Sequence, residues 1–107
     1  EPPGPRMKIE TNERALSLRG TVKDQDLPKL REVLIEALTS DSVGHLDLEP
    51  LRSVDVYLLQ LVAVALSESA TRGRSWTLGL PRVGRELASK VGLEPHLSPF
   101  LREKVSA

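Results

Sequence analysis

The chain has 107 residues, and its 15 basic and 15 acidic side chains give a formal net charge of zero. This length fits one domain, and the balanced charge argues against a general polyanion binder. The sequence has no cysteine, which excludes disulfides and thiolate metal sites. Because that composition suits a reducing compartment, we expect a cytoplasmic protein.

The ends of the chain and its longest apolar run set the domain limits. Residues 1–6 include three prolines, and we expect them to be a disordered lead or a cloning remnant. Residues 7–107 are then a single domain that begins at Met7. The apolar run Leu58–Leu66 is broken by Gln60 and is far shorter than the ~20 residues of a membrane span, so no direct membrane insertion is expected.

The first half of the chain predicts a β-hairpin and a helix. Met7–Glu13 and Ala15–Val22 alternate with period two around a turn at Asn12–Arg14. Asp26 is the expected N-cap of a helix that runs to about Thr39, with a proline in its first turn.

A strand at His45–Leu48 is followed by a second helix, for which Asp55 is the expected N-cap and Thr71 the approximate end. This helix is apolar almost all round. It therefore either packs on more than one side at the centre of the domain or presents an apolar edge to a partner.

The remaining elements complete an α/β pattern. Ser75–Leu80 predicts a strand, and Pro81 opens a third helix with apolar positions four apart that ends at Gly92. Ser98-Pro99 predicts a last short helix to Val105. The order predicts a mixed sheet of four to five strands flanked by helices, with the Asp26 and Asp55 helices adjacent on one face.

Catalytic and metal-binding residues are scarce. His45 and His96 are the only histidines, and neither has a partner at ligand spacing. His45 is expected to be an ordinary strand-edge residue. Asp47, Glu49 and Asp55 form a loose acidic group that could suggest Mg²⁺, but a strand end, a loop and a helix cap explain them better. The sequence therefore predicts no enzyme activity, no cofactor and no metal.

A nucleic-acid site has one point in its favour. Four arginines surround the single Trp76, and interleaved arginine and aromatic residues suit stacking on bases: Arg72, Arg74, Arg82 and Arg85. The other aromatic residues, Tyr57 and Phe100, lie elsewhere in the sequence. A lone tryptophan in a strand is more often part of the core, so no nucleic-acid partner is expected.

The segment Leu46–Leu93 resembles the STAS domain family, named for sulfate transporters and anti-sigma factor antagonists. The resemblance rests on five ordered features: Leu46-Asp47-Leu48 as the strand, Asp55 after the Pro50–Val54 loop, Leu59-Gln60-Leu61 in the helix opening, Arg72-Gly73-Arg74 before the strand Trp76–Leu80, and Pro81–Leu93 as the closing helix. It implies a STAS-like fold and a protein-binding regulatory role.

Several positions depart from the family pattern. The Ser or Thr that a partner kinase phosphorylates in anti-sigma antagonists corresponds to Val56, which has no hydroxyl. Tyr57 and Leu58 replace a small residue and a glycine, and Lys23 replaces an aspartate. The phosphorylation switch is therefore missing at its usual place, although the docking surface can remain.

The resemblance implies a non-enzymatic protein-interaction module, in a bacterial partner-switching or chemotaxis-type pathway. Its partner is expected to be an anti-sigma or histidine-kinase-like protein, a chemotaxis protein or a transporter component. The candidate partner-binding residues are Ser53, Asp55, Val56 and Tyr57, at the start of the second helix. The alternatives are a STAS subunit of a lipid- or anion-transport complex, or a small-ligand-binding domain.

Overall fold

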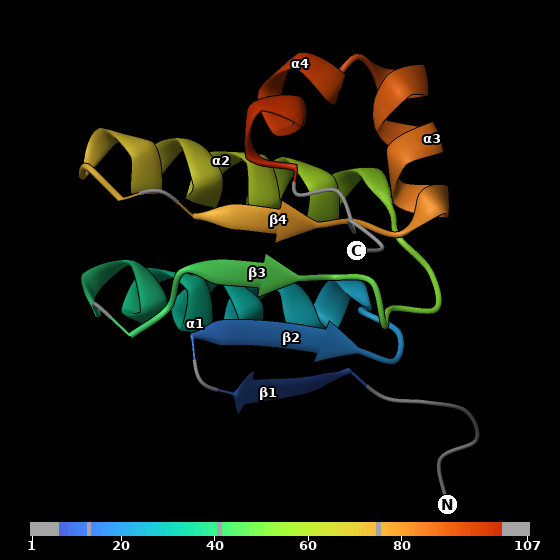
Figure 1. The fold of residues 1–107 in the computed structure, drawn as a ribbon. Helices are drawn as coiled ribbons and strands as arrows, with labels where there is room; N and C mark the ends of the chain where they lie inside the picture. Colours follow the sequence, from blue (N-terminus) through green and yellow to red (C-terminus); the bar gives the residue numbers. More distant parts are fainter. Residues whose placement is uncertain (1–6, 13, 41, 75, 102–107) are drawn as a thin grey trace, which may run out of the picture.

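The protein is built around a mixed four-stranded sheet (Figure 1). The computed structural model describes residues 7–12, 14–40, 42–74 and 76–101. The strands are β1 (Lys8–Asn12), β2 (Ala15–Arg19), β3 (His45–Asp47) and β4 (Thr77–Gly79), in that spatial order. β1 is antiparallel to β2, whereas β2, β3 and β4 are parallel. The predicted sheet is confirmed with shorter strands, and Glu13 and Ser75 lie outside the described residues.

Two of the main helices, α1 (Leu27–Thr39) and α2 (Val56–Thr71), lie on one face of this sheet. They are followed in the chain by α3 (Arg82–Val91) and the short α4 (Glu94–Leu97), and the 3₁₀ turns are η1 (Asp24–Asp26) and η2 (Ser98–Phe100). α1 and α2 contact each other behind the sheet in the view of Figure 1. This arrangement confirms the same-face prediction, since crossovers of one hand between parallel strands return on one side.

The core lies between the sheet and α1 and α2. Alternate strand residues point into it because successive side chains of a strand face opposite sides, and Leu18, Leu46 and Leu78 are completely buried. From α2, Leu59 and Leu66 are also completely buried. α2 contacts α1, α3 and α4, which confirms that it packs on more than one side.

Two helix ends differ in detail from the sequence prediction. Asp26 occupies the N-cap position of α1, as predicted, but its carboxylate makes no capping hydrogen bond to that helix; it accepts one from the backbone N–H of Lys23 at 2.9 Å, because the turn η1 precedes the helix. A last helical segment does begin at Ser98, but it is the 3₁₀ turn η2, and the sequence prediction missed the short helix α4 that precedes it from Glu94. Each of α4 and η2 has a proline in its first turn. The expected end, Val105, lies outside the described residues.

The buried side of α3 also differs from the sequence pattern. Its apolar positions four apart are only partly covered, and Val83 and Val91 are 52% and 41% exposed. The buried residues are instead Gly84 and Ala88. A Cβ atom on Gly84 would lie 2.9 Å from Cδ1 of Leu80, so α3 approaches the core through its small residues and turns its valines outward.

Candidate protein-docking site

The predicted site lies where β3 and β4 end and where α2 and α3 begin. Because β3 and β4 are parallel, the connections that leave their carboxyl ends emerge at the same edge of the sheet, on the right of Figure 1. In open α/β sheets this edge is a common place for binding sites. One long loop, residues 48–55, enters α2 there, and Pro81 begins α3 directly after β4.

Backbone hydrogen bonds fix the loop on both sides. The N–H of Leu48 donates to the carbonyl of Gly79 in β4 at 2.8 Å, and the N–H of Arg52 donates to the carbonyl of Gly20 after β2 at 2.9 Å. The carboxylate of Asp47 accepts from the N–H of Glu49 at 3.1 Å, which tightens the turn. These hydrogen bonds hold the loop against β4 and the end of β2, and so fix the position from which α2 begins.

Asp55 is the N-cap of α2, as the sequence predicts. Its backbone is extended, with φ −121° and ψ 174°, and its Oδ1 accepts a hydrogen bond from the N–H of Leu58 at 2.8 Å. This bond satisfies one of the N–H groups that a helix start leaves without an intrahelical partner. Asp55 thus has a structural task, and a contact with a partner remains a prediction.

The other predicted binding residues surround this cap. Ser53 is exposed, Val56 is half-buried, and Tyr57 is 64% exposed at the first turn of α2. Between them Val54 packs against the core and anchors the segment. The structure therefore gathers all the predicted residues at one end of one helix and turns an aromatic ring outward there.

One apolar residue at this edge was not predicted from the sequence. Val83, in the first turn of α3, is 52% exposed at the end of the molecule where α2 also begins. The signal that could have found it is Gly84, because a glycine inside a helix often marks a close approach by the neighbouring chain.

The residues considered for catalysis or metal binding are not grouped into a metal site among the described residues. His45 is not a strand-edge residue, because β3 lies between β2 and β4; its Nδ1 is 2.7 Å from Oγ1 of Thr77. Among the described residues, no group of three or more His, Cys, Asp or Glu side chains could hold a metal ion. In the same part of the chain, no helix is long and apolar enough to cross a membrane.

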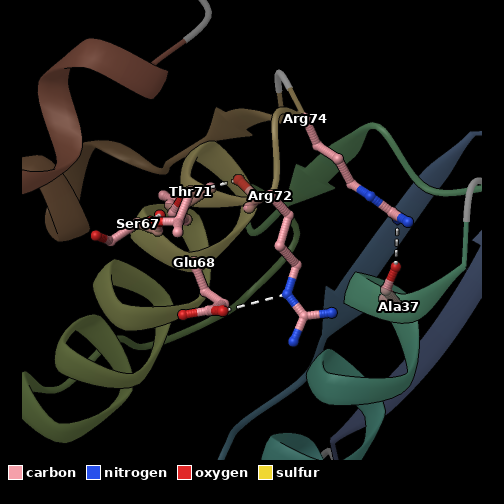
Figure 2. Close-up of polar contacts among 8 residues, drawn as sticks. Ala37, Ser67, Glu68, Thr71, Arg72 and Arg74 are labelled. Carbon is pink, nitrogen blue, oxygen red and sulfur yellow. Dashed lines mark hydrogen bonds and ion pairs between the residues drawn. The ribbon is translucent and has the colours of Figure 1, made fainter.

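The arginines near Trp76 make contacts within the chain (Figure 2). Arg72 forms an ion pair with Glu68 at 3.2 Å, and Nη1 of Arg74 donates to the carbonyls of Ala37 and Ser40 at the end of α1. Trp76 is only 2% exposed and cannot stack on a base. Arg74 therefore ties the loop after α2 to the end of α1, and the tryptophan belongs to the core.

Comparison with solved structures identifies the fold. SpoIIAA, an anti-sigma factor antagonist, matches in its unphosphorylated form with 16% identity and a TM-score of 0.66, over 94% of this chain and 90% of that one. An anti-sigma factor antagonist from Mycobacterium paratuberculosis has 15% identity and a TM-score of 0.69, over 94% and 86%. The Bacillus protein SpoIIAA in its phosphorylated form has 16% identity and a TM-score of 0.64, over 94% and 93%.

The chain has the anti-sigma factor antagonist fold. The STAS-like architecture implied by the sequence resemblance is therefore confirmed, and it covers nearly the whole chain. No family model and no curated protein matches the sequence. At 15–16% identity, the likeness to these structures shows the fold alone.

Proposed function

We propose that this protein is a non-enzymatic regulatory module that binds another protein through the start of α2. The contact residues are Ser53, Val56 and Tyr57, with Asp55 holding the helix start in place. The context is a cytoplasmic bacterial signalling pathway of the partner-switching or chemotaxis type, and the partner is an anti-sigma or histidine-kinase-like protein.

The observation that carries this proposal is the exposure of Tyr57, which is 64% accessible although the next residues, Leu58 and Leu59, are buried. Tyrosine is enriched among the residues that dominate binding energies, because it offers a large contact area and a polar tip. Here the ring stands on a capped helix whose entry loop is hydrogen-bonded on both sides. A ring on such a rigid base loses little conformational entropy when it is bound.

Val56 determines how this binding is regulated. One structural neighbour, SpoIIAA, exists in a phosphorylated form, and the family resemblance puts the acceptor hydroxyl at the residue after the helix cap. A phosphate there would add about −1.5 to −2 charges beside a partner. Val56 has no oxygen to carry it, so binding is set by the amounts of the protein and its partner and by the state of the partner.

The proposal is tested by calorimetric titration with purified kinase-type anti-sigma factors and chemotaxis proteins of the source organism. Tyr57→Ala should weaken binding by about tenfold or more, as truncation of an aromatic hot spot does. The matched control is Ile35→Ala, which removes a 45% exposed apolar side chain from α1. Equal losses for the two variants, or no loss for Tyr57→Ala, would place the docking surface elsewhere.

The small-ligand alternative is favoured by a groove of about 490 Å³ on the outer side of α2. It lies between α2 and the turns α4 and η2, and its lining includes Val64, Leu93 and Phe100. Val64 is 67% exposed, so the groove is open to solvent. Saturable binding of an apolar fluorescent probe that Val64→Glu abolishes would favour a carrier. A transporter gene beside the coding gene would favour a subunit of a lipid- or anion-transport complex.

A further inference from the structure

Within the described residues, the outer edge of β1 is an unpaired edge of the sheet. β1 is the first strand in the spatial order, and within the described chain β2 is the strand that pairs with it. An edge strand presents a row of N–H and C=O groups that can pair with another chain. Which residues of β1 present these groups follows from the hydrogen bonds of β2.

β2 turns its even-numbered residues toward β3. The carbonyl of Arg14 accepts from the N–H of His45 at 3.1 Å, and the carbonyl of Gly20 accepts from the N–H of Arg52 on the same side at 2.9 Å. Because backbone groups alternate in direction along a strand, the odd-numbered residues of β2 face β1. Their partners in β1 are therefore the residues whose backbone points inward: Lys8, Glu10 and Asn12.

Ile9 and Thr11 consequently direct their N–H and C=O groups away from β2, into the free edge. Their side chains differ from those of the inward residues as well. The Ile9 side chain is half-buried and packs against the core, whereas Lys8 and Glu10 are exposed on the open face of the sheet. The edge thus combines outward backbone groups with alternating apolar and charged side chains.

We propose that this edge pairs with the same edge of a second copy of the chain, as an antiparallel β1–β1 ladder centred on Ile9. In this register, Ile9 faces Ile9 of the second copy and the two residues exchange both backbone hydrogen bonds. Lys8 faces Glu10 of the second copy, and Glu10 faces Lys8. The ladder joins two four-stranded sheets into one continuous sheet.

Charge complementarity selects both the partner and the register. In an antiparallel ladder, a residue whose N–H and C=O point toward the second strand must lie opposite another such residue. One β1 strand can therefore slide along the other only in steps of two residues. One such shift places Glu10 against Glu10, and the opposite shift places Lys8 against Lys8. Like charges directly opposite each other destabilise a ladder, whereas opposite charges stabilise it. The register centred on Ile9 alone places Lys8 against Glu10 twice.

The dimer has a consequence that rests on the proposed function. Because the two β1 strands are antiparallel, the carboxyl ends of the parallel strands in the two copies point in opposite directions. The two α2 starts then lie at opposite ends of the joined sheet, and the partner-binding surfaces remain free. Such a dimer binds two partners, or one partner dimer with increased avidity.

The test is sedimentation equilibrium of the purified protein over a range of concentrations and salt. The wild-type protein should show a reversible dimer that weakens with salt, as exposed ion pairs do. Lys8→Glu and Glu10→Lys should each weaken dimerisation by about tenfold, because two favourable cross-strand pairs become repulsive. An equimolar mixture of the two variants should recover the affinity, since Glu at 8 then faces Lys at 10.

Two further measurements separate this ladder from other dimers. Lys8→Glu leaves the Arg19–Glu10 ion pair at 3.4 Å in place, so its effect cannot come from losing that pair. In amide NMR spectra, the signals of Ile9 and Thr11 should shift with protein concentration more than those of Lys8 and Glu10. A monomer at all concentrations, a dimer that ignores both charge changes, or a mixture that fails to associate would overturn the proposal. None of these measurements involves a partner protein, so they leave the proposed function to its own test.

Discussion

Leu58 and Leu59 are 1% and 0% exposed, whereas Tyr57, directly before them, is 64% exposed. The change occurs within the first turn of α2, because the cap at Asp55 sets where the helix begins and hence which side of it each residue occupies. One helix therefore stabilises the domain through its buried residues and offers the proposed binding surface at its start. The two roles lie on adjacent residues, so mutations can separate stability from binding.

The largest expected effect is on the buried side of α2. Leu66→Ala should lower the free energy of unfolding by about 2–5 kcal/mol, because the Leu66 side chain is completely buried and its truncation leaves a cavity in the core. Denaturant melts measure this loss. Tyr57→Ala should change the same free energy by less than about 0.5 kcal/mol, as typical exposed substitutions do. Similar losses for both variants would show that Tyr57 belongs to the core.

The helix cap links the two regions, and its removal should have an intermediate effect. Asp55→Ala removes the hydrogen bond from Oδ1 to the N–H of Leu58 and should cost about 1 kcal/mol of stability. Asp55→Asn is the matched control, because asparagine is an equally good cap and should retain most of that stability. If Asp55→Asn loses as much as Asp55→Ala in thermal and denaturant melts, the carboxylate acts through something other than capping.

Lys23 should have the smallest effect on stability. Its side chain is exposed, and the nearby hydrogen bond to Asp26 uses its backbone N–H, which any residue except proline supplies. Lys23→Ala should therefore change the free energy of unfolding by less than about 0.5 kcal/mol. A loss comparable to that of Leu66→Ala would mean that the lysine side chain supports the start of α1 in a way its exposure does not indicate.

The sequence was sufficient for the order of the strands and main helices, because strong local signals mark them. Period-two alternation marked the hairpin, the Asp55 cap marked α2, and Gly92, with φ 79°, ended α3. The apolar composition of α2 left two possibilities, a central position or an apolar edge for a partner, and the contacts of α2 with α1, α3 and α4 support the first. The local signals depend on residues close together in the chain, and so they can be read without the tertiary structure.

The sequence failed where a distant contact decides the outcome. The side of α3 that is buried depends on the close approach of Gly84 to Leu80, and the four-residue spacing of the apolar residues does not reveal it. Likewise, His45 was predicted to be a strand-edge residue, although β3 lies between β2, which precedes it in the chain, and β4, which follows it. For the candidate site, the Asp55 cap could be predicted from the sequence, but the exposure of Val83 in the first turn of α3 could not.

The last prediction concerns the chemistry of the exposed helix start, where we expect no phosphate to be added. Val56 has no acceptor oxygen, and the nearby hydroxyls belong to Ser53 and Tyr57. A phosphate on Ser53 would lie near the Asp55 carboxylate, where like charges repel, and a kinase that acts on short Ser or Thr side chains is poorly suited to the tyrosine.

Intact-mass measurement after incubation with serine kinases of the source organism should show no stoichiometric gain for the wild-type protein. Val56→Ser is the matched variant, because it restores a hydroxyl directly after the cap without changing the loop or Asp55. Phosphate on the variant alone would show that the docking surface is intact and that only the acceptor is missing. Stoichiometric phosphate on Ser53 of the wild-type protein would instead show that the switch has moved by three residues, and regulation by phosphorylation would replace constitutive binding.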